Sequence, residues 1–255
     1  MSNLPVVPHW INGQEVPGKP DHIALVTDPA LGVATKQVHV AGDEEIEAAF
    51  ASAQAAFPKW RDMSQARKQA ILFKFRELLN ERKHECAALI TEEHGKVLDD
   101  ALGEVTRGQE VVEFACGMPH LLKGMFTENA SSGVDVYSIR QALGVVGIIS
   151  PFNFPAMVPM WFFPVAIAAG NTVVVKPSEK VPSATLWMAK LWKEAGLPDG
   201  VFNVLNGNRT TVQAMLEDER IKAISFVGST PVAKYIYEEG SKHGKRVQAL
   251  GGAKN

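Results

Sequence analysis

Residues Gly147–Pro155 read Gly-Ile-Ile-Ser-Pro-Phe-Asn-Phe-Pro, and this stretch predicts the class of fold for the whole 255-residue chain. Its apolar start predicts a buried strand, and its prolines predict a turn that carries one amide side chain, Asn153. Pro155 stands where the first turn of a helix would begin, a position that proline tolerates well. Side chains at the carboxyl end of a buried strand lie where α/β folds bind ligands, and an amide there can donate to an oxyanion. The alternative is that Asn153 only caps its own turn.

Strand and helix patterns alternate from this stretch to the end of the chain. Strands are predicted at Val145–Ile149, Thr172–Lys176, Val201–Leu205, Ala223–Val227 and Arg246–Leu250. Helices separate them, notably Ser183–Ala195 before the stop signal Gly196. Nearly continuous apolar strands separated by helices predict a parallel sheet covered on both faces, in a Rossmann-like, doubly wound α/β fold. No G-x-G-x-x-G follows the first strand, so an ordinary dinucleotide site is not indicated.

The earlier part of the chain is predicted to form a helical layer that packs on this sheet. Residues 1–42 carry short strands and turns, and helical periodicity then begins behind a possible N-cap at Asp43. A second helix is expected from about Ser64, a third is expected to end at Gly95, and a fourth covers about 99–118.

The polar passage 124–143 alternates like a β-hairpin arm and is a candidate subunit contact. Three parts are therefore expected: 1–123, 124–143 and 144–255.

The composition is that of an ordinary globular protein, with 46% hydrophobic residues and a formal net charge of −2. The charge balance predicts no nucleic-acid partner. The two cysteines, Cys86 and Cys116, offer neither a disulfide framework nor metal-site spacing. The N-terminus lacks the features of a signal or transit peptide, and the longest apolar stretch, Phe154–Gly170, is broken by three prolines. We expect a cytoplasmic protein with no membrane partner and no metal.

Two further predicted strands also end in polar residues. Lys176 and Glu179 follow the second strand, and Gly228-Ser229-Thr230 follows the fourth and opens a helix. Because the ends of parallel strands share one edge of the sheet, these residues and Asn153 are able to contact one ligand. Lys176 and Glu179 can hydrogen-bond a ribose diol, and a helix N-terminus binds phosphate. The alternatives are a solvated ion pair and a simple N-cap at Ser229.

These segments together resemble the aldehyde dehydrogenase superfamily, in its order and approximate spacing, over essentially the whole chain. The segments that carry the resemblance are Gly147–Pro155, Lys176–Glu179, Phe226–Thr230 and Leu250–Gly252. The longer strings Pro151–Phe163 and Val247–Asn255 resemble the methylmalonate (malonate) semialdehyde dehydrogenase branch, whose members acylate CoA.

The resemblance implies roles for particular residues. Asn153 matches the family's oxyanion-stabilising asparagine. The positions that match NAD contacts are Lys176 and Glu179 at the adenosine ribose, Lys180 at the adenosine end, Ser229 at the pyrophosphate, and Ser150, Phe152 and Gly251 around the nicotinamide. The Glu179 carboxylate would repel a 2′-phosphate, which favours NAD over NADP.

Arg107 matches an arginine that holds the substrate carboxylate in the semialdehyde branch. A guanidinium suits this role because it binds a carboxylate through two parallel hydrogen bonds. The alternative is an ion pair with Glu104 or Glu110, three residues away on a solvated helix face.

Two departures from the family pattern bear on function. Most hydrolytic members carry a glutamate before Leu-Gly-Gly that activates water, but here Ala249 stands there and cannot act as a base. This favours CoA as the acyl acceptor. The family's nucleophilic cysteine lies beyond the last residue of this chain, and Cys86 and Cys116 fall in the helical layer. A smaller difference, Ala233 in place of a common glycine, is expected only to adjust helix packing.

The sequence therefore resembles the first half of the enzyme, with the family's C-terminal catalytic domain absent. The expected function is the NAD-binding half of a CoA-acylating dehydrogenase for methylmalonate or malonate semialdehyde, a homo-oligomer (a homotetramer) at full length and inactive as this chain alone. The alternatives are half of a hydrolytic aldehyde dehydrogenase and a non-catalytic nucleotide-binding module.

Overall fold

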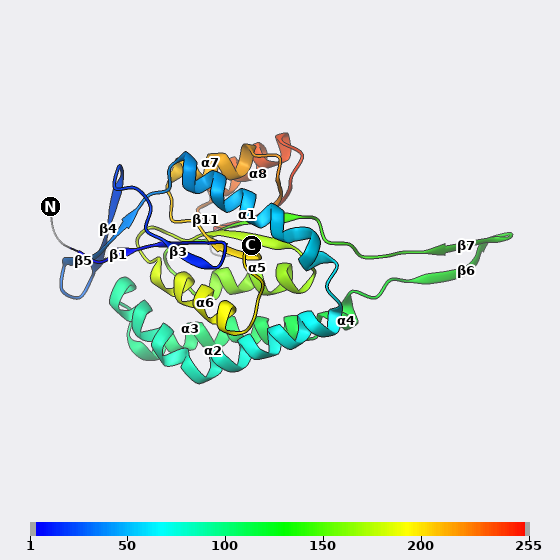
Figure 1. Ribbon diagram of the computed structural model, residues 1–255, viewed down its shortest axis with the longest axis horizontal. Coiled ribbons are helices and arrows are strands. Elements are labelled where there is room, and N and C mark those ends of the chain that lie inside the picture. The colour runs from blue at the N-terminus through cyan, green and yellow to red at the C-terminus, as the bar shows by residue number, and fades with distance from the viewer. Residues whose placement is uncertain (1–3, 253–255) are drawn as a thin grey trace.

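The computed structural model describes residues 4–252, and its centre is a seven-stranded sheet between two layers of helices (Figure 1). The last three residues of the string Val247–Asn255 lie outside the described residues. The strands are β1 Val6–Val7, β2 His9–Ile11, β3 Gln14–Val16, β4 Ile23–Asp28, β5 Val33–His39, β6 Phe126–Ser131, β7 Val134–Tyr137, β8 Val145–Ile149, β9 Thr172–Lys176, β10 Phe202–Val204, β11 Ile221–Gly228 and β12 Arg246–Gly251. The helices are α1 Asp43–Arg61, α2 Gln65–His94, α3 Leu98–Cys116, α4 Met118–Leu121, α5 Met157–Ala168, α6 Ser183–Glu194, α7 Arg209–Glu217 and α8 Thr230–Lys242.

The five predicted strands are confirmed as a parallel sheet. The order of the whole sheet is β12-β11-β8-β9-β10-β2-β3, and β12 to β10 run parallel. Every residue of β8 and β9 is buried, because helices cover both faces of these central strands. The sequence did not predict that β2 and β3 would extend this sheet as an antiparallel hairpin beside β10. Asn12 and Gly13, both at positive φ, form its two-residue turn.

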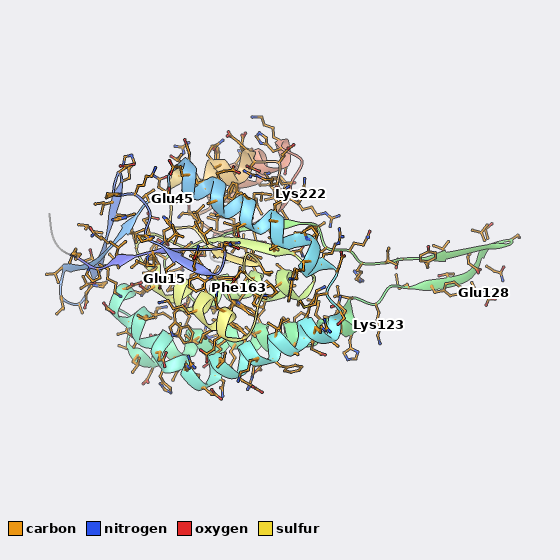
Figure 2. The ribbon with its side chains drawn as sticks, viewed as in Figure 1. Glu15, Glu45, Lys123, Glu128, Phe163 and Lys222 are labelled. Carbon is orange, nitrogen blue, oxygen red and sulfur yellow. The ribbon has the colours of Figure 1, made fainter. Side chains whose placement is uncertain are left out.

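The helices divide between the two faces, as a doubly wound fold requires. Helices α2, α3, α5 and α6 form one layer, and α1, α7 and α8 form the other (Figure 1). Phe163 of α5 lies within the first layer (Figure 2), where its ring meets Phe75 of α2, Trp192 of α6 and Phe202 of β10 edge-on. Each layer has its own apolar core against the sheet.

Two predictions about the N-terminal helices were wrong in detail. The second and third predicted helices are one helix, α2, because its 30 residues contain no glycine or proline that would interrupt them. It ends at Gly95, at φ 83°, as predicted. The N-cap of α1 is Gly42 rather than Asp43, and the Glu45 carboxylate accepts a hydrogen bond from the Gly42 amide at 3.0 Å.

The predicted hairpin arm forms and projects from the body of the protein. Strands β6 and β7 pair antiparallel, with every residue of both exposed. Lys123 lies near the base of the arm and Glu128 far out along it (Figure 2). Its role as a subunit contact stays a prediction, as does the division of the chain at residues 124 and 144.

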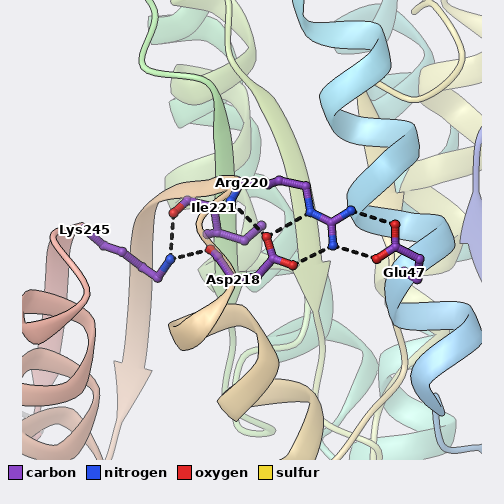
Figure 3. A network of polar contacts seen from close by, with 5 residues as sticks. All are labelled: Glu47, Asp218, Arg220, Ile221 and Lys245. Atoms are coloured by element: carbon purple, nitrogen blue, oxygen red, sulfur yellow. Dashed lines mark hydrogen bonds and ion pairs between the residues drawn. The ribbon is translucent and has the colours of Figure 1, made fainter.

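A charged network holds the amino-terminal ends of two parallel strands, β11 and β12, together (Figure 3). Arg220, just before β11, donates to both carboxylate oxygens of Glu47 on α1 at 2.7 Å and to Asp218 at 2.9 Å. Lys245, just before β12, donates to the carbonyls of Asp218 and Ile221 at 2.6 and 2.8 Å. These contacts tie both strands to α1 at the edge opposite the ligand-binding edge of such folds. Within residues 4–252, no helix has the length and apolar character needed to cross a membrane.

His9 makes the stability of the fold depend on pH. This fully buried side chain of β2 accepts a hydrogen bond from the Asn206 amide at Nδ1, 3.0 Å away. Burial lowers the pKa of His9 to about 4; Glu45 opposes this shift and His39 adds to it. Between pH 6.5 and 4 the unfolded chain binds a proton that the folded chain does not. Folding stability therefore falls as the pH drops through this range, by up to about 3 kcal/mol.

We predict that His9→Gln reduces the loss of folding stability between pH 7 and pH 5. Urea unfolding midpoints at pH 7 and pH 5 measure it, with His22→Gln at an exposed histidine as the control. The parent and the control should lose stability between the two pH values, and His9→Gln should lose less. An equal loss in all three proteins would show that His9 is not the group responsible.

Candidate functional site

The topology brings the predicted strand ends together at one edge of the sheet. From β8 the chain moves outward through β9 and β10, then returns to place β11 on the other side of β8. The helices after β8 and β11, α5 and α8, therefore cover opposite faces. This reversal is the switch point where open α/β sheets bind ligands, and the loops that carry Asn153, Lys176 and Ser229 start there.

The loop after β8 offers several groups to a ligand. The Ser150 amide donates to the Lys176 carbonyl at 3.2 Å, which joins the ends of β8 and β9. The Ser150 side chain is buried, and its Oγ has no hydrogen-bond partner among the described residues. Phe152 is half-exposed; its ring centre lies 5.2 Å from the Lys180 ammonium and 6.4 Å from the His94 ring. Asn153 is exposed.

Glu104 of α3 caps the helix that follows this loop. It is fully buried, and its Oε1 accepts from the amides of Ala156 and Met157 at 2.8 and 3.1 Å. Its Oε2 lies 2.7 Å from the Lys96 ammonium, which also donates to the Asn153 carbonyl at 3.0 Å. The predicted alternative of a solvated Arg107–Glu104 pair is wrong, because Glu104 faces the core.

Glu93 makes a similar cap at α6, the helix after β9. Its Oε2 accepts from the Ser183 amide at 3.1 Å, and its Oε1 accepts from the Ser183 hydroxyl. The Lys36 ammonium lies 3.0 Å from Oε1 and balances its charge. Glu93 is nearly inaccessible to solvent, so the N-terminus of α6 is closed by a carboxylate that belongs to the protein.

Helix α8, which follows β11, begins without such a cap. Ser229 occupies its N-cap position but makes no side-chain capping hydrogen bond, so a simple N-cap role for the hydroxyl is not realised. No carboxylate caps this helix among residues 4–252. A Cβ on Gly251 would lie 2.7 Å from that of Ala233, so β12 packs directly on the first turn of α8. Of the three helices, α8 therefore has the N-terminus best able to receive an external anion.

Lys176 and Glu179 form a pair at the end of β9. The ammonium and Oε2 lie 3.4 Å apart, with the Lys176 side chain 8% exposed and that of Glu179 38% exposed. Burial lowers the pKa of Lys176, and the Glu179 carboxylate opposes this shift. The ion pair therefore exists, but its cation is not solvated as the alternative assumed. A donor and an acceptor side by side suit the two hydroxyls of a ribose.

The remaining candidates are less closely tied to this edge. Arg107 is exposed on α3 one turn after Glu104, and it has no ion pair within residues 4–252. Over the same residues no group of three His, Cys, Asp or Glu side chains is arranged to hold a metal ion. Burial raises the pKa of Cys116 to about 11 and that of Cys86 further, so neither thiol is activated as a nucleophile.

Sequence reasoning missed Glu93, Lys96 and Glu104, which organise the edge. For Glu104 a signal was available, since it falls within the buried stripe of α3 formed by Ala101, Val105 and Val112. A carboxylate on an apolar helix face is rarely buried without a partner. No comparable local signal identifies the partners, which are 52 and 53 residues further along the chain.

Comparison with known proteins gives one family. The model described as "Aldehyde dehydrogenase family" matches residues 16–255. A malonate-semialdehyde dehydrogenase of Pseudomonas aeruginosa is 50% identical over 97% of this chain and 50% of its own length. A mitochondrial methylmalonate-semialdehyde dehydrogenase [acylating] of Arabidopsis thaliana is 46% identical over 98% of this chain and 41% of its own.

A solved structure from Sinorhizobium meliloti, described as a methylmalonate-semialdehyde dehydrogenase complexed with NAD, has the same fold. It superposes with a TM-score of 0.96 at 46% identity, over all of this chain and 52% of that protein. The chain thus spans about half the length of the relatives it matches.

Proposed function

The chain belongs to the aldehyde dehydrogenase family, and we propose that it is the NAD-binding half of a CoA-acylating dehydrogenase for methylmalonate or malonate semialdehyde. The observation that carries this proposal is the edge at β8, β9 and β11, where the Lys176–Glu179 pair follows β9 and the uncapped N-terminus of α8 follows β11, on either side of β8. The first suits a ribose and the second a pyrophosphate.

NAD fits the groups that this edge leaves available. Lys176 and Glu179 would hold the adenosine ribose, Lys180 would flank the adenosine end, and Ser229 would contact the pyrophosphate. Around the nicotinamide half we propose Ser150 and Phe152 in the loop after β8 and Gly251 at the end of β12. The unpartnered Ser150 hydroxyl fits a bound ligand at this place. When bound, NAD supplies a hydride acceptor.

Asn153 and Arg107 would act on the aldehyde. The neutral Asn153 amide can donate to the oxyanion that forms when a nucleophile attacks the carbonyl, which stabilises the charge without introducing a counterion. Arg107, exposed and without an ion-pair partner in residues 4–252, can bind the substrate carboxylate through two hydrogen bonds. The family resemblance implies that the nucleophilic cysteine belongs to the part of the relatives that this chain does not cover.

Ala249 supports transfer of the acyl group to CoA rather than to water. This residue of β12 pairs with Phe226 of β11, close to the end of the strand. Its methyl group cannot remove a proton from water, so a thiol is the more effective acceptor of the acyl group. The Arabidopsis thaliana relative is named as acylating, which also favours this proposal over a hydrolytic enzyme.

Assembly is proposed for the full-length protein. The arm formed by β6 and β7 exposes apolar side chains to solvent, including Phe126, Val136 and Tyr137. An exposed two-stranded ribbon with apolar side chains favours pairing with another copy, which supports the proposed homotetramer. A non-catalytic nucleotide-binding module remains the alternative from another class.

We predict that the 255-residue chain binds NAD more tightly than NADP and that Glu179→Gln narrows this preference. The carboxylate repels a 2′-phosphate, and an amide of the same shape does not. Isothermal titration with both cofactors measures the ratio of affinities. Glu219→Gln, which removes the same charge near the opposite edge, is the matched control and should leave the ratio unchanged. The same chain should form no NADH from malonate semialdehyde and CoA.

An unchanged NAD-to-NADP ratio in Glu179→Gln would remove Glu179 from the ribose site. If neither cofactor binds, the nucleotide-binding role of the isolated chain fails.

A second prediction concerns the acyl acceptor. In a restored enzyme, made by continuing this chain with the second half of the Pseudomonas aeruginosa relative, NADH formation should depend strongly on CoA. Ala249→Glu should raise the CoA-independent rate, because a carboxylate near the thioester can take a proton from water. Steady-state NADH formation with and without CoA measures this, and Ala249→Gln, which has similar size but no base, is the control. A parent enzyme that is equally fast without CoA would favour the hydrolytic alternative.

A further inference from the structure

We infer that Glu104 and Lys96 are positioning residues that fix Asn153 for oxyanion stabilisation; this inference rests on the role proposed for Asn153. Both side chains lie on the α2–α3 side of the molecule, far in sequence from the loop they hold. Neither needs to contact substrate or cofactor, since each acts through the backbone of the loop.

The Glu104 carboxylate holds the end of the loop that leads into α5. It accepts the amides of Ala156 and Met157, which belong to the N-terminus of the helix and would otherwise lack partners. A buried carboxylate at this end of a helix also interacts favourably with the helix dipole. Between Asn153 and these amides stand only Phe154 and Pro155, and the proline ring restricts φ. Fixing the helix start therefore limits where Asn153 can lie.

The Lys96 ammonium holds the other end. It donates to the Asn153 carbonyl at 3.0 Å and to Glu104 at 2.7 Å, and it lies 4.4 Å from the centre of the Phe154 ring. Its side chain is only 11% exposed and its contact with Glu104 is partly buried, whereas its contact with the Asn153 carbonyl lies at the surface. Lys96 directly follows Gly95, whose left-handed conformation ends α2 and fixes the place from which the lysine reaches the loop.

These contacts divide the functions of Asn153 between its backbone and its side chain. The carbonyl is bound to Lys96, whereas the side-chain amide makes no hydrogen bond within residues 4–252 and is exposed. The backbone that carries this amide is thus held in place, and the amide itself makes no bond that would compete with an oxyanion. Preorganised donors of this kind contribute to catalysis because little reorganisation is needed when charge develops.

The test compares single and double variants in the restored enzyme, with kcat, the KM for NAD and Tm measured for each. Asn153→Ala should lower kcat about 100-fold, as expected for loss of an oxyanion donor. Glu104→Gln and Lys96→Met should each lower kcat about tenfold, with the KM for NAD changed less than about twofold. Lys96→Arg, which keeps the charge, should retain most of the activity. Combining Glu104→Gln with Asn153→Ala should cost no more than Asn153→Ala alone, because the carboxylate acts through Asn153.

Asp218→Asn is the matched structural control, since it disturbs the Arg220 network at the opposite edge. It should lower Tm without lowering kcat. In the 255-residue chain, amide exchange over residues 153–158 should be faster in Lys96→Met than in the parent or in Asp218→Asn. If Glu104→Gln does not fold, Lys96→Met with Asn153→Ala supplies the same double-variant comparison, because it leaves the carboxylate cap in place.

The positioning inference is overturned if the kcat losses of Glu104→Gln and Asn153→Ala multiply in the double variant. It is also overturned if Glu104→Gln and Lys96→Met lower Tm but leave kcat unchanged. An Asn153→Ala enzyme with normal kcat would refute the proposed role of Asn153 itself, and the inference with it. The two failures are distinguishable, because in the first case Asn153→Ala still lowers kcat.

Discussion

Two buried carboxylates determine which helix N-termini at the functional edge are available to bind an external anion. Glu104 closes the start of α5 by accepting from the amides of Ala156 and Met157, and Glu93 closes the start of α6 by accepting from the amide and the hydroxyl of Ser183. An anionic ligand would have to displace a charge that the protein holds in its own core, which is unfavourable. Helix α8 has no such cap among the described residues, so the edge is biased toward one phosphate site rather than three.

This arrangement gives a physical reason for the absence of a glycine-rich loop after β8. In an ordinary dinucleotide fold, that loop brings pyrophosphate to the helix that follows the first strand. Here Glu104 already occupies the N-terminus of that helix, and the loop is free to carry Asn153 on a backbone held by Lys96. The proposed catalytic group and the proposed phosphate site can therefore lie on opposite sides of the switch point. The Arg220 network secures the other edge of the sheet, away from both.

How far the sequence predicts this structure depends on how local the signal is. The parallel strands and the polar residues at their ends could be predicted, because continuous apolar runs and turn residues are local patterns. The hairpin of β2 and β3 was not placed in the main sheet, since its pairing with β10 joins Trp10 to Val204. The burial of Glu104 was missed for the same reason: its partners at α5 are supplied by tertiary packing, and a helical charge normally faces solvent.

The role of the two carboxylate caps is tested most directly by the crystal structure of the 255-residue chain with NAD. We predict that the pyrophosphate lies against the first amides of α8 beside Ser229, with the adenosine ribose between Lys176 and Glu179 and with both carboxylate caps intact. A pyrophosphate at the start of α5 or α6, with Glu104 or Glu93 displaced, would contradict it.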